Sequence, residues 1–304
     1  MHKVKANVLV TGAHGLLGYN LIKQLKNKFD VFALDLFIKK ELCLQGVKYI
    51  KADITNQKEM TALIKSHHPR YIFNAAAYTN VDGAETEKEL CWKINVEGVA
   101  RLAHAARLSG SRLIHVSTDY IFDGNSGPYS EDIKPDPLGY YGKSKLAGEN
   151  ELTTSGANWA IGRTMVLYGF APGARLNFVT WIVEQLRNKN KIRIVDDQIG
   201  NPTLASDLAS ALIKLAVSSI NDVFHLSGSE IIDRYHFAKM VADVYQLDPN
   251  LIERIKTADL GQAANRPLNS GFLLKKAKKE LGIQMLDARS GIEQLKSEIE
   301  NKHE

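Results

Sequence analysis

The chain has 304 residues, 44% of them apolar, and is therefore long enough to bury a large core in one large domain or in a large and a small one. Its net charge of +5 is mildly basic, and since no nucleic-acid-reading motif accompanies that charge, we predict no nucleic-acid partner. No apolar run approaches the roughly 20 residues that a bilayer requires, and the first residues lack the apolar core of a signal peptide, so we expect a cytoplasmic protein without a membrane partner.

The first predicted strand, residues 7–11, runs into a glycine-x-x-glycine-x-x-glycine turn, and a helix begins behind it. Glycines there permit positive φ angles and let backbone N–H groups approach a phosphate at the positive end of the helix. The same turn also occurs without a ligand, so the pattern gains weight only from its neighbours. The residues that we predict to contact a dinucleotide in this turn are Gly12, His14, Gly15, Leu16, Leu17 and Gly18.

The second predicted strand, residues 31–35, ends in Asp35, about 20 residues after the glycines, where a carboxylate can accept hydrogen bonds from an adenosine ribose. Lys39 and Lys40 follow and could instead meet a ribose 2′-phosphate, so we expect NADPH or NADH, with use of both left open. The third strand, residues 46–52, leads to Asp53 and Ile54, which we predict to flank the adenine.

The fourth predicted strand, residues 71–78, runs out into three small side chains, Ala75, Ala76 and Ala77. They leave room for a flat cofactor, although tight packing of a helix on the sheet would also explain them. One long helix over residues 85–109 and a fifth strand over 112–117 follow. Strands that alternate with helices in this way indicate an α/β protein with a Rossmann-type, doubly wound parallel sheet, whose ligands bind at the carboxyl ends of the strands.

The next helix begins near Tyr141 and carries Lys145 four residues later, on the same face. A free tyrosine titrates near about 10, and we expect the ammonium of Lys145 to lower the pKa of the phenol. The spacing Tyr-x-x-x-Lys occurs at two other places in the chain, so it is not specific by itself. Only this pair starts a helix directly after a strand with a hydroxyl at its tip, Thr118.

The second half of the chain has a looser pattern of short elements. We assign residues 1–165 to a dinucleotide-binding domain, to which about 191–227 return, and residues 166–304 to a smaller C-terminal substrate-binding part. Its polar turns and helix starts offer side chains for a nucleotide and a diphosphate, although loop capping and surface pairing would explain them equally well. These candidates are Asn177, Gln198, Thr203 and Arg266.

Several longer motifs accompany the glycine turn and the tyrosine-lysine pair. They are Asn74 to Asp82 (NAAAYTNVD), Ser117 to Gly124 (STDYIFDG), Tyr141 to Glu149 (YGKSKLAGE), Asp197 to Thr203 (DQIGNPT) and Arg266 to Ser270 (RPLNS). Together they resemble the extended short-chain dehydrogenase/reductase superfamily and, more narrowly, are similar to the dTDP-4-dehydrorhamnose reductase family.

The resemblance implies an oxidoreductase of polysaccharide biosynthesis that uses NAD(P)H to reduce the 4-keto group of a dTDP-linked 4-keto-6-deoxyhexose, turning dTDP-4-dehydrorhamnose into dTDP-rhamnose. Thr118, Tyr141 and Lys145 would then be the catalytic set, with Tyr141 and Lys145 also at the cofactor and Asp119 and Tyr120 at the nucleotide sugar.

Two departures bear on the alternatives. Met165 follows Arg163 and Thr164 where many rhamnose reductases carry a tryptophan, which leaves the sugar open. Sister enzymes that dehydrate sugars carry a second carboxylate after the threonine-aspartate pair, where this chain has Tyr120, so simple reduction is favoured. An epimerase and a non-catalytic NADP-binding regulatory subunit, like the beta subunit of methionine adenosyltransferase, stay open, as does a homodimer. We expect no metal site within the chain, since neither the two cysteines nor an acidic cluster has ligand spacing, and a divalent ion at an interface stays open.

Overall fold

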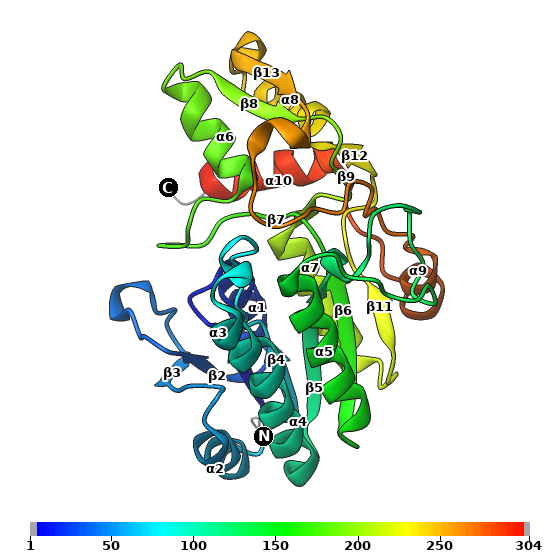
Figure 1. Cartoon of the computed structure of the whole chain (residues 1–304). Coiled ribbons are helices and arrows are strands. Elements are labelled where there is room, and N and C mark those ends of the chain that lie inside the picture. Colours follow the sequence, from blue (N-terminus) through cyan, green and yellow to red (C-terminus); the bar gives the residue numbers. More distant parts are fainter. Residues whose placement is uncertain (1–4, 301–304) are drawn as a thin grey trace.

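The computed structural model describes residues 5–300. A seven-stranded sheet in the order β11-β6-β5-β4-β1-β2-β3 forms its centre (Figure 1). Every neighbouring pair in this sheet is parallel, which confirms the predicted doubly wound α/β fold. The strands are β1 (Asn7–Thr11), β2 (Asp30–Asp35), β3 (Lys48–Lys51), β4 (Tyr71–Asn74), β5 (Arg112–Thr118), β6 (Asn158–Thr164) and β11 (Val223–His225).

Helices cover both faces of this sheet, as β1 illustrates. Val8 and Val10 pack against one face, beside α1 (Leu16–Leu25) and α7 (Ala205–Val217), whereas Leu9 packs against the other, beside α2 (Gln57–His67) and α4 (Gly98–Ser109). Because both faces are buried, the strand is a continuous apolar run without polar alternation. The helix α5 (Tyr140–Thr154) packs along α4 and β5.

The prediction of one long helix over residues 85–109 is wrong in its details, because this segment is not one continuous α-helix. It is divided into a short turn, η2 (Gly83–Glu85), the helix α3 (Lys88–Trp92), a π-helical segment, η3 (Lys93–Glu97), and α4. The π segment carries Asn95, whose Oδ1 accepts from the N–H of Tyr78 (2.9 Å) and whose Nδ2 donates to its C=O (3.1 Å). The strand β4 ends at Asn74, earlier than predicted, and Asn95 binds the backbone of Tyr78 beyond that end.

The C-terminal elements α6, α8 and α10 lie together above the central sheet (Figure 1). The helix α7 packs on the central sheet and β11 is one of its edge strands, whereas β8 pairs with β13 in a separate two-stranded sheet. None of the helices in residues 5–300 combines the length and the apolar character needed to span a bilayer. The remaining strands and α-helices are β7 (Leu167–Tyr168), α6 (Phe178–Arg187), β8 (Ile192–Val195), β9 (Ile199–Gly200), β10 (Thr203–Leu204), β12 (Ile232–Asp233), α8 (Arg234–Val244), β13 (Ile252–Ile255), α9 (Lys275–Leu281) and α10 (Ala288–Glu300). Four short helical turns complete the described elements: η1 (Lys40–Leu42), η4 (Asp119–Ile121), η5 (Pro249–Leu251) and η6 (Thr257–Leu260).

Candidate active site

The glycine turn between β1 and α1 packs directly on the chain that leaves β4. Gly12 has a φ of 67°, and a Cβ at this position would lie 2.9 Å from the backbone of Ala75 and of Ala76. No side chain of the described residues caps α1 at Gly15. The first N–H groups of α1 therefore stay available for an anion, beside the half-buried residues 75–77.

Asp35, at the end of β2, lies against this turn. Its Oδ2 accepts from the backbone N–H of His14 (2.9 Å), and the N–H of Ala52 donates to its carbonyl (2.9 Å). These contacts bring the acidic residue, the glycine turn and the start of the Asp53-Ile54 segment together. An uncapped helix start, a carboxylate beside it and small residues on the far side fit a bound dinucleotide.

Tyr141 lies in the first turn of α5, which packs closely on the turn after β5. A Cβ at Gly142 would lie 2.1 Å from the carbonyl oxygen of Tyr120, so only glycine permits this approach. The ring of Tyr141 is buried, with its face at 78° to the ring of Tyr120 (5.5 Å between centroids), and its hydroxyl is hydrogen-bonded to the side chain of Thr118. The predicted proximity of tyrosine and threonine is thus present in the structure.

The pKa of Tyr141 has the opposite direction from the one we predicted. Burial raises it well above the ordinary value, the charge of Asp119 raises it further, and the hydrogen bond with Thr118 opposes this only in part. The lowering that we expected from Lys145 does not outweigh burial, and Nζ of Lys145 has partners other than the phenol. It donates to the carbonyl of Val116 (2.7 Å) and contacts Nε2 of His115 (3.3 Å).

Lys145 is itself a perturbed group. Its side chain is buried, and burial lowers its pKa to about 8, while the charge of Glu149 opposes the shift. Glu149 is already bound by both Nε and Nη2 of Arg163 (3.0 and 2.7 Å). Within residues 5–300, the hydrogen-bonding partners of the ammonium are therefore the neutral carbonyl of Val116 and the ring of His115.

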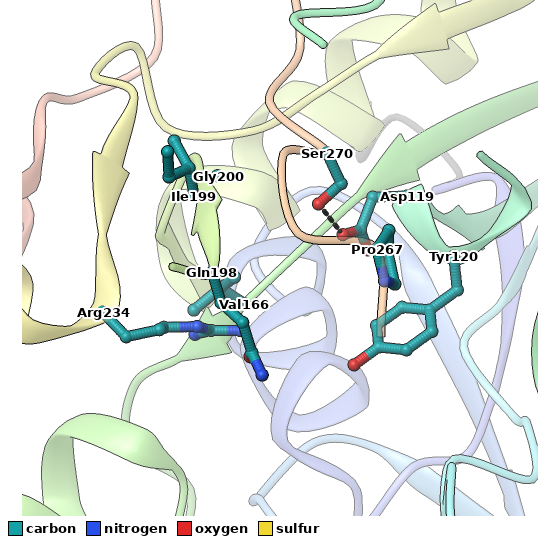
Figure 2. A pocket seen from close by; sticks show the side chains of 9 residues that line it. All are labelled: Asp119, Tyr120, Val166, Gln198, Ile199, Gly200, Arg234, Pro267 and Ser270. Atoms are coloured by element: carbon teal, nitrogen blue, oxygen red, sulfur yellow. Dashed lines mark hydrogen bonds between the residues drawn. The ribbon is translucent and has the colours of Figure 1, made fainter. Parts of the chain in front are cut away.

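A small pocket next to Tyr120 joins the two parts of the chain (Figure 2). Asp119, in the turn after β5, accepts from Thr118 Oγ1 (3.1 Å) and from Ser270 Oγ (2.6 Å), and burial raises its pKa. The side chains of Tyr120, Gln198 and Arg234 extend into the same space in Figure 2. Three of the predicted substrate residues, Asp119, Tyr120 and Gln198, are thus brought together.

Arg266 lies near this pocket, but its guanidinium already has a partner. Nη1 and Nη2 donate to the two carboxylate oxygens of Asp82 (2.9 and 2.7 Å). Arg234, the first residue of α8, was not singled out from the sequence. Among residues 5–300 its guanidinium makes no hydrogen bond or salt bridge, although the charge of Asp119 acts on it, and it lies over the ring of Phe178 (5.2 Å). No sequence pattern distinguishes Arg234 from the other arginines, because its lack of a salt bridge is a tertiary property.

The other two predicted substrate residues do not line this pocket. Asn177 caps α6, with Oδ1 accepting from the N–H of Thr180 (3.3 Å) and Nδ2 donating to the carbonyl of Gly169 (2.7 Å). It borders a separate cavity of about 500 Å³ between α6 and Tyr245. Thr203 is fully buried, and its hydroxyl donates to the carbonyl of Asn201 (3.0 Å). We therefore leave Thr203 out of the substrate-binding set.

Fold and site together define the class of protein. A glycine-rich turn after β1, a hydroxyl at the end of β5, and tyrosine and lysine one turn apart on the next helix are the arrangement of the extended short-chain dehydrogenases/reductases. The family model described as the RmlD substrate binding domain matches residues 6–301. The chain belongs to this family, which confirms the resemblance inferred from its motifs.

Individual relatives extend over nearly the whole chain. A dTDP-4-dehydrorhamnose reductase from Aggregatibacter actinomycetemcomitans is 37% identical, and the similarity covers 97% of this chain and 100% of the relative. The structure of a dTDP-4-dehydrorhamnose reductase from Bacillus anthracis in complex with NADP is 32% identical, with a TM-score of 0.88 over 97% of this chain and 100% of that one. The beta subunit of methionine adenosyltransferase 2 from Danio rerio is 32% identical, over 86% of this chain and 81% of the relative.

Proposed function

We propose that this protein is an NAD(P)H-dependent sugar-nucleotide 4-ketoreductase that reduces dTDP-4-dehydrorhamnose to dTDP-rhamnose. The observation that carries the proposal is the buried contact of Tyr141 with Thr118 beside the pocket that Tyr120 and Arg234 line. The name of the relative from Aggregatibacter actinomycetemcomitans, a dTDP-4-dehydrorhamnose reductase, and the NADP in the Bacillus anthracis structure support it.

In this proposal, residues at the carboxyl ends of β1, β2, β3 and β4 would hold the cofactor. The start of α1 binds its diphosphate, Asp35 binds the adenosine ribose, and the chain at Asp53 flanks the adenine. When bound, the dinucleotide supplies a hydride to the ketone carbon. The full set of proposed contacts is Gly12, His14, Gly15, Leu16, Leu17, Gly18, Asp35, Asp53, Ile54, Ala75, Ala76, Ala77, Tyr141 and Lys145.

Tyr141 is the proton donor. Because burial raises its pKa, the phenol keeps its proton at neutral pH and can transfer it to the ketone oxygen as the carbon is reduced. The product is an alcohol, and the phenolate left behind is reprotonated from solvent. Thr118 donates a hydrogen bond to the same ketone oxygen, and the charged Lys145 stabilises the phenolate and binds the nicotinamide ribose.

Arg234 takes the role that the sequence suggested for Arg266. Because Asp82 occupies the guanidinium of Arg266, the unpaired cation in the pocket is Arg234, and it binds the diphosphate of the nucleotide sugar. Arg266 supports the pocket wall instead, and Gln198, with Nε2 donating to Thr257 (3.1 Å), lies beside the ligand. Asp119 and Tyr120 contact the sugar, and Asn177 stays a candidate for the nucleotide.

The test is turnover of a defined substrate. Purified protein, incubated with dTDP-4-dehydrorhamnose and either NADPH or NADH, should oxidise one equivalent of cofactor for each dTDP-rhamnose formed, as measured by absorbance and by NMR of the sugar. Binding of NADPH without turnover of any dTDP-4-ketosugar would overturn the proposal. An epimerase would change the sugar without net consumption of reduced cofactor.

A second candidate function follows from the similarity to the beta subunit of methionine adenosyltransferase 2. A regulatory subunit would bind the dinucleotide and alter the activity of a partner enzyme without turning over a ketosugar. Adding the purified chain to a methionine adenosyltransferase and measuring its rate distinguishes the two, because a ketoreductase leaves that rate unchanged. The expected homodimer stays a prediction.

A further inference from the structure

A line of buried polar side chains crosses the sheet from the glycine turn to Lys145. Thr11 in β1, Asn74 in β4 and His115 in β5 lie on adjacent strands, and Lys145 approaches from α5. Oγ1 of Thr11 lies 2.7 Å from Oδ1 of Asn74, Nδ2 of Asn74 lies 3.0 Å from Nδ1 of His115, and Nε2 of His115 lies 3.3 Å from Nζ of Lys145. None of the four residues is more than 2% exposed.

Among the described residues, His115 is the one side chain that hydrogen-bonds Lys145, because the other groups nearby have partners of their own. Glu149 on α5 is bound to Arg163, and Tyr141 on the same helix is hydrogen-bonded to Thr118. Cys91 on α3 contacts Ser144 (3.2 Å), and burial raises the pKa of its thiol, so it carries no charge at neutral pH. The carbonyl of Val116 supplies the other acceptor for the ammonium.

The protonation of His115 decides whether it can accept from Lys145. Burial, with the charge of Lys145 adding to it, lowers the pKa of His115 well below its ordinary value, so the ring is neutral and carries one proton. Facing a charged Lys145, Nε2 must accept and the proton must lie on Nδ1. In the structure Oδ1 of Asn74 faces Thr11 and Nδ2 faces His115, so this arrangement requires the amide of Asn74 to be flipped, with its oxygen accepting from Nδ1–H and its amino group facing Thr11.

The reverse arrangement accompanies an uncharged Lys145. Nε2–H then donates to the lysine nitrogen, Nδ1 accepts from the amino group of Asn74, and the oxygen of Asn74 accepts from the hydroxyl of Thr11. The same heavy-atom positions serve both arrangements, because exchanging the oxygen and nitrogen of the amide is the only change. The charge on Lys145 is thus coupled to the tautomer of His115.

We propose that His115 is a positioning residue that keeps Lys145 charged and directed at the substrate side of β5, by accepting a hydrogen bond from the ammonium at Nε2. The reason for keeping Lys145 charged rests on the proposed function, in which the ammonium stabilises the phenolate of Tyr141. The geometry of the contact does not depend on that function. The ligand-free protein therefore suffices for the first test.

The first measurement uses wild-type protein labelled with ¹⁵N-histidine. At neutral pH the ring of His115, assigned with His115→Gln, should be the Nδ1–H tautomer, and it should change to Nε2–H as Lys145 loses its proton. Detection of Nε2–H at neutral pH would overturn the inference. Because no substrate is present, this result is independent of whether the protein turns over a ketosugar.

The second measurement compares two polar replacements of similar size. Glutamine can place its amide oxygen where Nε2 lies, whereas asparagine reaches only the position of Nδ1. The titration of Lys145 is followed by NMR of ¹³Cε-lysine and assigned with Lys145→Met. In His115→Asn the pKa of Lys145 should fall by about one unit, which is the loss expected for one hydrogen bond to a charged group. His115→Gln should titrate within a few tenths of a unit of wild type.

The same shift should appear in activity if the proposed function holds. In His115→Asn the fall of kcat at alkaline pH should begin about one pH unit lower, with KM unchanged. A purely structural role for His115 would lower the melting temperature of both variants and leave the titration of Lys145 in place, which contradicts the inference. Should His115→Asn fail to fold, the tautomer of the wild-type ring still decides the question.

Discussion

Asp82 and Arg266, 184 residues apart in the chain, bind each other through two parallel hydrogen bonds. Asp82 lies between β4 and η2, and Arg266 lies four residues before Ser270, whose hydroxyl donates to Asp119. The pair therefore connects the C-terminal part of the chain to the edge of the sheet where Tyr141 lies. The pocket wall depends on this connection.

Breaking the Asp82–Arg266 pair should destabilise the protein in a pH-dependent way. The hydrogen bond from Arg266 lowers the pKa of Asp82, so the stabilisation is complete at neutral pH and is lost as the pH falls through the lowered pKa. We expect Asp82→Asn to reduce the free energy of unfolding by about 1 kcal/mol at neutral pH, measured with urea, and by less in acid.

The surface pair of Asp243 and Arg289 is a matched control. Its N–O distance is 2.8 Å, against 2.7 Å for the Asp82–Arg266 pair, but both of its side chains are exposed to solvent. Asp243→Asn should leave the free energy of unfolding nearly unchanged. Equal losses in the two variants would show that the Asp82 pair has no special role.

Removing the hydroxyl of Tyr141 should abolish most of the activity and spare cofactor binding. Tyr141→Phe keeps the buried ring but lacks the proton donor, so we expect kcat to fall by about 10³-fold while the dissociation constant of NADPH changes little. Tyr235→Phe is the matched control, because Tyr235 has the same spacing to Lys239 but lies on α8. Near wild-type turnover in Tyr141→Phe would rule out its assignment.

Arg234 should govern the affinity for the diphosphate. Losing a charge-assisted hydrogen bond there should raise KM for the nucleotide sugar in Arg234→Gln by about 10- to 100-fold, with a smaller change in kcat. Inhibition by dTDP should weaken by the same factor, whereas inhibition by thymidine should stay unchanged. Arg193→Gln, at an exposed position of β8, serves as the control. Unchanged inhibition by dTDP would contradict the assignment.

The lowered pKa of Lys145 predicts opposite trends for activity and stability at alkaline pH. Turnover should fall above about pH 8, where the ammonium loses its proton. Burial lowers its pKa in the folded state below the unfolded value, so the unfolded chain binds more protons between the two values, and stability rises with pH there. Relative to Lys145→Met, wild type should gain on the order of 2 kcal/mol from about pH 7 to about pH 9.5 in urea unfolding. No relative gain would mean that Lys145 does not titrate near pH 8.

The interruption at Asn95 illustrates a limit of sequence-based prediction. The apolar stripe predicts helix on both sides of Asn95, and both sides are helical. The π-helical turn itself arises because the backbone of Tyr78, which continues the strand pattern of β4, is satisfied by the amide of Asn95. That choice depends on a contact between two segments, which local propensity does not contain.

Local patterns determined the parts of this protein whose geometry repeats along the backbone. The alternation of strands and helices, the glycine turn after β1, the acid at the end of β2 and the placement of Tyr141 and Lys145 on one helical face follow from residue spacing, because backbone periodicity fixes which side chains share a face or a strand end.

Only the tertiary structure decided which of these side chains are free, paired or charged. Arg266 is occupied by Asp82 while Arg234 makes no salt bridge among residues 5–300, Thr203 is fully buried, and the pKa of Tyr141 is raised. Each of these properties depends on burial and on partners far away in the chain, and the free energy of a buried charge or hydrogen bond is set by those neighbours and not by the residue type.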